Sequence, residues 1–151
     1  MAETINLSDL PKAVGREFVS DWVLIDQERI SEFADVTDDH NWVHVDIPRA
    51  TAFRGGTIAH GLLTMTLLPG LSYKLFNVGG TEHALNYGLE HVRFTGIVRT
   101  GTRVRLRLTI KGVEQKGAGV VLTNTFVFER ENEDKPAVVG ESLGMFFPKA
   151  A

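Results

Sequence analysis

The segment from Thr57 to Leu71 is apolar on most of the faces that a helix would present. A helix at a protein surface has one apolar stripe and one polar face, so a helix of this kind has to be covered by other elements. His60, Gly61 and Pro69 interrupt the segment, which falls short of the ~20 apolar residues that a membrane span needs. We therefore predict a core helix wrapped by a sheet, with no membrane partner. Pro69 is expected to kink or end the first part of this helix.

In the second half of the chain, apolar and polar residues alternate with the two-residue period of a β-strand. Within 102–110, apolar residues at positions 104, 106, 108 and 110 alternate with arginine or threonine at 103, 105, 107 and 109, which predicts a strand with one buried face. Further strands are predicted over 120–129 and 137–147, separated by a charged turn at 131–136, and a longer bent strand over 83–98. These segments indicate an antiparallel meander.

The first half is less regular. Residues 21–26 indicate a short strand, and Asp26 is placed to cap a helix that ends near Thr37. Residues 1–20 are expected to form a short helix or an irregular arm, and residues 38–56 an ordered loop long enough to suggest a functional role. A length of 151 residues fits one domain, 1–151, of the α+β class.

Composition excludes several classes of function. The net charge of -3 lacks the basic excess of a general nucleic-acid binder, so no nucleic-acid partner is expected. With no cysteine, the chain has no disulfide, thiolate metal site or cysteine nucleophile. The first residues do not have the pattern of a secretory signal, and we expect a cytoplasmic protein.

The densest group of reactive side chains lies at 38–46, inside the long loop. Asp39 and His44 are spaced so that a carboxylate and an imidazole in a turn can converge on one water molecule and move its protons. That pairing suits the addition or removal of water. A solvated polar loop is the simpler alternative. A metal site built from His40, His44, Asp46 and His60 is a third, but the spacing matches no zinc signature.

A second element, 59–62, stands at the head of the predicted core helix. The first N–H groups of a helix have no partner inside it, and Gly61 would let a ligand oxygen approach the backbone closely. The Gly61 N–H is therefore a candidate oxyanion donor, for instance toward a thioester carbonyl. The alternative for this glycine is close packing of the helix on the sheet.

Together, the run 39–46 and the run 59–62 resemble the hydratase signature of MaoC-like acyl dehydratases and (R)-specific enoyl-CoA hydratases. That signature reads D-x-N-P-aliphatic-H-x-D followed by H-G. Residues 56–64, 86–94 and 136–142 further resemble the NodN-like branch, so the similarity extends over about 21–147.

The resemblance implies a hot-dog fold, in which a curved antiparallel sheet wraps a long helix, and a homodimer whose subunits pair their sheets. It implies reversible addition of water to trans-2-enoyl thioesters of CoA or acyl carrier protein, with no metal and no redox cofactor. Asp39 and His44 would hold and activate the water, Asn41 would orient them, and the Gly61 N–H would bind the thioester carbonyl. Asp46 and His60 would support the loop.

The chain departs from the signature at two positions. Trp42 replaces the usual proline, as it does in the NodN-like branch, and Asp38 replaces a common glycine, although Asp tolerates a left-handed backbone. Three other groups of side chains are interpreted as structural: Arg103, Arg105 and Arg107; His83 and His91; and Met65, Thr66 and Pro69. As alternatives, the three arginines could hold CoA phosphates, and Met65, Thr66 and Pro69 could line an acyl tunnel.

Two other functions remain open. A thioesterase on the same fold needs a carboxylate on the central helix, and residues 57–76 contain neither Asp nor Glu. A non-catalytic protein that binds acyl-CoA would keep the loop for recognition only, and the Trp42 departure leaves room for it.

Overall fold

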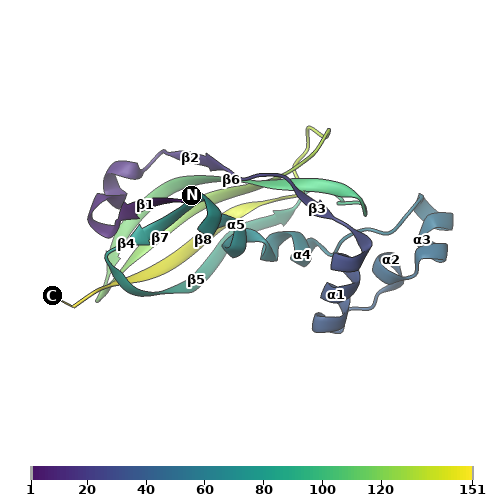
Figure 1. Cartoon of the computed structure of the whole chain (residues 1–151), viewed down its shortest axis with the longest axis horizontal. Helices are drawn as coiled ribbons and strands as arrows, with labels where there is room; N and C mark the ends of the chain where they lie inside the picture. Colours follow the sequence, from purple (N-terminus) through teal and green to yellow (C-terminus); the bar gives the residue numbers. More distant parts are fainter. Residues whose placement is uncertain (1, 151) are drawn as a thin grey trace.

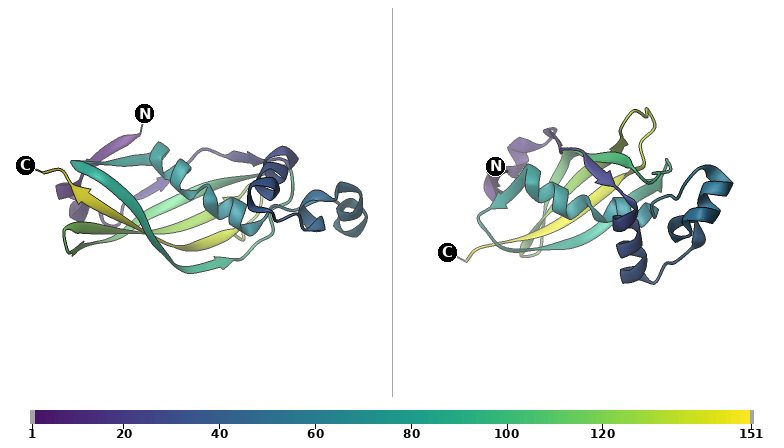
Figure 2. Two further views of the ribbon diagram at one scale, coloured as in Figure 1. Left: turned by 90° about the horizontal axis from the view of Figure 1, so that it is seen from below. Right: turned by 45° about the vertical axis from the view of Figure 1, so that its right-hand side comes forward.

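The computed structural model describes residues 2–150, which form a curved antiparallel sheet with two helices lying along its concave face (Figures 1 and 2). The helical elements are η1 (Leu7–Ala13), α1 (Gln27–Thr37), α2 (Trp42–Val45), α3 (Ile47–Arg54), α4 (Gly61–Thr66) and α5 (Leu68–Leu75). The strands are β1 (Glu3–Asn6), β2 (Glu17–Val19), β3 (Val23–Ile25), β4 (Phe76–Gly79), β5 (Thr81–Phe94), β6 (Thr102–Lys116), β7 (Gly119–Arg130) and β8 (Val138–Pro148).

The large sheet has the strand order β2-β6-β7-β8-β5, and β3 also pairs with β6. The predicted meander is confirmed for β6, β7 and β8, which follow one another as antiparallel neighbours. It is wrong for β5, which pairs with β8 instead of β6 and forms the far edge of the sheet. Periodicity marks the faces of a strand but carries no information about which strand lies beside it.

The predicted core helix is present but shorter and divided. It begins at Gly61, and residues before it are extended, with Ile58 bridged to Arg99. It divides at Leu67, where α5 begins with Pro69 in its first turn, as expected from a residue without a backbone N–H. Leu63, Leu68 and Leu71 are buried against the sheet, whereas Leu62 on α4 is 54% exposed. In a single chain the sheet therefore covers one side of the helix, not all of it.

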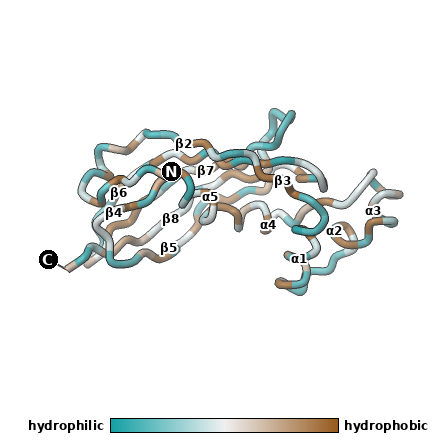
Figure 3. The backbone as a smooth tube through the Cα atoms, viewed as in Figure 1, coloured by the Kyte–Doolittle hydropathy of each residue, from teal (hydrophilic) through white to brown (hydrophobic). Residues whose placement is uncertain are grey.

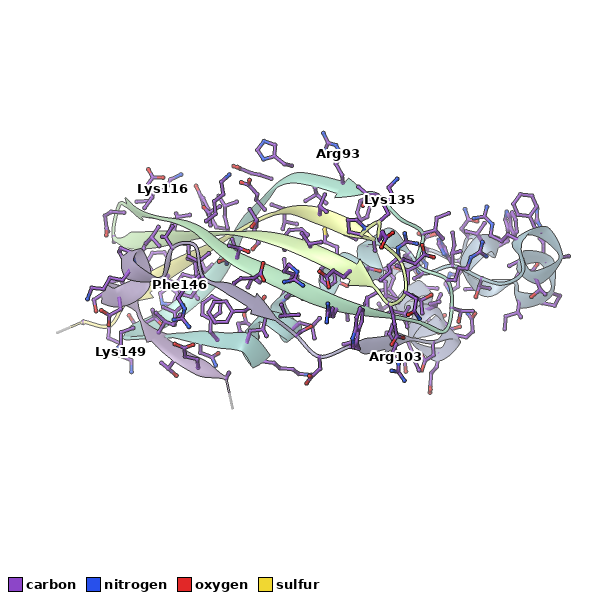
Figure 4. The ribbon with its side chains drawn as sticks, turned by 90° about the horizontal axis from the view of Figure 1, so that it is seen from above. Arg93, Arg103, Lys116, Lys135, Phe146 and Lys149 are labelled. Carbon is purple, nitrogen blue, oxygen red and sulfur yellow. The ribbon has the colours of Figure 1, made fainter. Side chains whose placement is uncertain are left out.

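Alternation along β6 is confirmed. Leu106 and Leu108 are buried on the concave side with Phe126 and Phe128 of β7, and the hydropathy along these strands alternates accordingly (Figure 3). The predicted arginines lie on the other face, where Arg105 and Arg107 both pair with Glu129 of β7. Figure 4 shows this side of the sheet, with Arg103 and Arg93 toward opposite long edges. The arginines thus form a solvated ion-pair face.

The first half of the chain contains more regular structure than its sequence predicts. The arm 1–20 holds the predicted short helix, η1, but also β1, which runs parallel to β4, and β2, which pairs with β6. Asp26 caps α1 as predicted, accepting a hydrogen bond from the Arg29 N–H. The loop 38–56 is not irregular throughout, because it contains α2 and α3. Helices this short depend on their caps and leave little periodicity to detect.

Within residues 2–150, no helix combines the length and the apolar character that crossing a membrane requires.

Candidate active site

Helices α1, α2 and α3 extend beyond one end of the sheet as an overhang, defined here as residues 27–54 (Figure 1). Two side chains of the motif hold its short helices. The Asn41 carboxamide oxygen accepts from the Val43 N–H and caps α2, and an Asp46 carboxylate oxygen accepts from the Arg49 N–H and caps α3. These caps place His44 on α2 facing the sheet end of the overhang, toward residues 58–61.

His44 is held in one orientation and one protonation state. Its Nδ1 lies 2.7 Å from the Ile58 carbonyl oxygen, which can only accept, so Nδ1 carries the proton and Nε2 of the neutral ring is free to act as a base. Burial lowers the pKa of His44 below its usual value, and it outweighs the opposing hydrogen bond to Ile58. The histidine is therefore neutral at neutral pH, as a general base must be.

His60 supports both catalytic candidates. Its ring is 4% exposed and stacks on His44 with 3.7 Å between ring centroids and 24° between planes. Its Nε2 donates to the Asp39 backbone carbonyl over 3.0 Å and lies 4.0 Å from a carboxylate oxygen of Asp39. One buried ring thus ties the Asp39 turn to the His44 helix, which agrees with the supporting role expected of His60.

Asp39, His44 and His60 each present a ligand atom within 4.8 Å of the others, and the Asp39 side chain is 56% exposed. One water molecule can bridge an oxygen and a nitrogen over such a span. The same spacing could hold a metal ion, but a tetrahedral site needs lone pairs that converge on one point. Two rings stacked face to face direct theirs along nearly parallel planes, and each ring already gives one nitrogen to a backbone carbonyl. The geometry fits a bound water better than a metal.

Gly61 opens α4 beside the same site. A cavity of about 280 Å³ is lined by both His44 and Gly61, together with Phe94, Ala137 and Val138 among others. As the first residue of α4, Gly61 has no intrahelical acceptor for its N–H. A Cβ at this position would lie 2.6 Å from the Phe94 ring, so close packing also requires glycine here. The close packing expected of Gly61 is therefore confirmed, and its N–H stays a candidate oxyanion donor.

The family follows from comparison with known proteins. The MaoC like domain matches residues 9–130 of the chain. This chain belongs to the MaoC-like dehydratase family. It is 46% identical over 141 residues to 3-hydroxyacyl-thioester dehydratase Z of Mycobacterium tuberculosis, a match that covers 91% of this chain and 93% of that protein.

One further relative and one solved structure are similar to this MaoC-like chain. It is 40% identical over 139 residues to Nodulation protein N of Rhizobium leguminosarum bv. viciae, covering 89% of this chain and 86% of that protein. The solved R-hydratase PhaJ1 from Pseudomonas aeruginosa superposes with a TM-score of 0.74 at 23% identity, over 90% of this chain and 83% of that one. The predictions of an α+β hot-dog fold, of a NodN-like relative and of a family of hydro-lyases are confirmed.

The remaining motif residues of this MaoC-like chain contact other residues of the overhang or end its helices. His40 points to Asp35 on α1, 2.9 Å away, and Asp38 ends α1 with a left-handed backbone at φ 58°. Trp42 packs edge-on against Phe53 of α3 and lies under the Arg49 guanidinium, so it ties α2 to α3. None of these side chains lines the cavity, and neither does Asp39 or Asn41.

Sequence reasoning missed two residues of the site. Gln27 donates from Nε2 to the His44 carbonyl and accepts at Oε1 from the Thr57 hydroxyl, linking α1 to α2 and to the extended residues before α4. Phe94, at the end of β5, packs on Gly61 and walls the cavity. Phe94 lay inside a run that resembles the family, which is a usable signal. Gln27 had none, because its partners are distant in the sequence.

Proposed function

We propose that this protein catalyses the reversible addition of water to trans-2-enoyl thioesters, with (R)-3-hydroxyacyl thioesters as products. The observation that carries the proposal is the shared cavity of His44 and the Gly61 N–H, with the Asp39 carboxylate within reach of the same water. A base, a second proton carrier and an oxyanion donor are the three groups that this reaction needs. The homologous dehydratase Z is named for the same class of thioester.

In the hydration direction, water bound between Asp39 and His44 loses a proton to this pair as its oxygen bonds to C3 of the enoyl chain. The C2–C3 π bond breaks, and its electron pair moves toward the thioester carbonyl oxygen. The Gly61 N–H donates to that oxygen while the negative charge develops. The pair then returns one proton to C2, so the protein is unchanged and one water has been added.

The catalytic pair is tested by Asp39→Asn and His44→Gln, each of which keeps the size of the side chain and removes its acid–base function. We expect each variant to lose at least ~100-fold in kcat with crotonyl-CoA, the usual size of an acid–base contribution. Loss of the conjugated enoyl absorbance measures the rate. The matched control is His40→Gln, in the same loop but paired to Asp35 on its exposed side. Near wild-type rates in both site variants would refute the mechanism.

The thioesterase alternative has less support. Helices α4 and α5 contain no Asp or Glu to activate a water on the helix side of the thioester. The Asp39 carboxylate precedes α2, outside these helices, and lies 4.0 Å from His60 Nε2. Release of free thiol from crotonyl-CoA, without a hydroxyacyl product, would reverse this ranking, and chiral analysis of the product distinguishes the (R) acid from the (S) acid.

We also propose that the protein acts as a homodimer that pairs the β5 strands of two copies. β5 is a long edge strand, and its apolar side chains Leu85, Tyr87, Leu89 and Phe94 are between 46% and 57% exposed. Long apolar edges left uncovered promote aggregation, so proteins pair or protect them. Pairing two copies through β5 satisfies this edge and lies beside the Phe94 wall of the cavity.

The carrier and cellular setting complete the proposal. We expect the acyl chain to be carried on CoA or on acyl carrier protein, because the exposed Asp39 side chain marks an open side of the site. We also expect the reaction to belong to fatty acid metabolism in the cytoplasm. Parallel assays with crotonyl-CoA and with crotonyl acyl carrier protein separate the two carriers through kcat/KM.

A further inference from the structure

One hydroxyl group at the active-site cavity is buried and unpaired. Thr64 lies on α4 and lines the same cavity as His44 and Gly61. The residue is 1% exposed, and its Oγ1 has no hydrogen-bond partner among the residues that the structure describes. A buried hydroxyl without a partner costs stability, so its presence at this position calls for an explanation.

The helix itself does not provide that explanation. A serine or threonine inside a helix can donate its hydroxyl to the backbone carbonyl three or four positions earlier. Hydroxyls on α1, α4 and α5 do so, in the donor–acceptor pairs Thr37 and Phe33, Thr66 and Leu63, and Ser72 and Leu68. Thr64 makes no such bond, although Thr66 makes one two positions later on the same helix. Its hydroxyl is therefore available to a ligand.

The other polar side chains of the cavity are already engaged. The lining contains three of them, His44, Thr64 and Thr95. The Thr95 hydroxyl donates to the Pro136 carbonyl over 2.7 Å, and Nδ1 of His44 donates to the Ile58 carbonyl. Of the two hydroxyls in the lining, only that of Thr64 lacks a partner within residues 2–150. A substrate group that enters the cavity can pair with it.

Thr64 follows Gly61 by three positions, so both residues lie on the same face of α4. Positions three apart on a helix are ~5–6 Å from each other, and side chains tilt toward the helix N-terminus, where the Gly61 N–H lies. Two donors can share one acceptor oxygen if each is ~3 Å from it, which requires a separation of no more than about 6 Å. The spacing of Gly61 and Thr64 therefore suits two hydrogen bonds to one oxygen.

We propose that the Thr64 hydroxyl is a second oxyanion donor, which binds the thioester carbonyl together with the Gly61 N–H. This inference rests on the proposed hydratase activity. Negative charge that develops on the carbonyl oxygen during the addition of water makes that oxygen a strong acceptor, and hydrogen bonds to it strengthen accordingly. The hydroxyl keeps its proton throughout, so the balance of the hydration reaction is unchanged.

The first test removes the hydroxyl and keeps the shape of the side chain. We expect Thr64→Val to lower kcat with crotonyl-CoA by roughly 100-fold, the usual effect of removing one oxyanion donor, with little change in KM. Thr64→Ser keeps a hydroxyl and should retain most of the activity. Thr66→Val is the matched control and should keep kcat, because the Thr66 hydroxyl is bonded to the helix backbone and Thr66 does not line the cavity.

Stability separates a role in the reaction from a role in folding. Because the Thr64 hydroxyl is unpaired in the free protein, Thr64→Val should melt at or above the temperature of the wild type. A structural hydroxyl would give the opposite result, with a lower melting temperature and an unchanged kcat, and that result would overturn the inference.

The second test observes the carbonyl group without turnover. In a His44→Gln background, infrared difference spectra of bound crotonyl-CoA, isotope-labelled at the thioester carbonyl, give a stretching frequency that hydrogen bonding lowers. Adding Thr64→Val should raise this frequency, and an unchanged frequency would overturn the inference. The measurement needs only binding, so it decides the role of Thr64 even if the wild type fails to hydrate crotonyl-CoA, a failure that would count against the proposed function instead.

Discussion

At the scale of single residues, burial and one hydrogen bond set the protonation of His44. Burial lowers its pKa, so the imidazole stays neutral at a pH where an ordinary histidine, with a pKa of ~6.5, is half protonated. We therefore expect the acid limb of the pH profile of kcat/KM to lie below that value. Stopped-flow hydration of crotonyl-CoA between acid and neutral pH measures it, and a limb at or above ~6.5 would contradict the lowered pKa.

The same shift has a consequence for stability, with a definite sign. Below ~6.5 the unfolded chain binds a proton at His44 more readily than the folded protein does, so this residue lowers the free energy of unfolding as the pH falls. Well above ~6.5 both states are unprotonated and the effect vanishes. Urea unfolding of wild type and His44→Gln across this range isolates it, because the variant lacks the titrating group.

At the scale of elements, the caps of short helices position the catalytic groups. Asn41 caps α2, which carries His44, and does not line the cavity. We expect Asn41→Ala to lower the free energy of unfolding by ~0.5–2 kcal/mol and to reduce kcat, since α2 loses its first hydrogen bond. Asn41→Asp keeps a capping oxygen and should restore both quantities, measured by urea unfolding and crotonyl-CoA hydration. An Asp variant as impaired as the Ala variant would show that the Asn41 amide acts on substrate.

At the scale of the whole molecule, the exposed β5 edge governs assembly. We expect light scattering after gel filtration to give twice the chain mass of 16.7 kDa for the wild type. Leu89→Lys places a charge on the proposed interface and should shift the protein to the monomer. Val14→Lys is the control, since both residues are 46% exposed and Val14 lies on the N-terminal arm. A wild type that is monomeric, or a Leu89→Lys protein that still dimerises, would contradict pairing through β5.

The sequence alone determined what depends on near neighbours. The alternation of β6, the Asp26 cap of α1 and the break before Pro69 were all predictable, because capping and face periodicity depend on residues a few positions apart. The spacing of Asp39 and His44 belongs to the same class, since one turn and one short helix carry both.

Only the tertiary structure decided which distant segments meet. It stacked His60 on His44, attached Gln27 to the His44 carbonyl, and placed β5 beside β8. It also left Asn124 unpaired over a pocket whose walls come from separate elements. Such contacts form because burying apolar surface is favourable whatever the distance between the two segments along the chain. The local sequence pattern of one segment therefore does not indicate which distant segment it will contact.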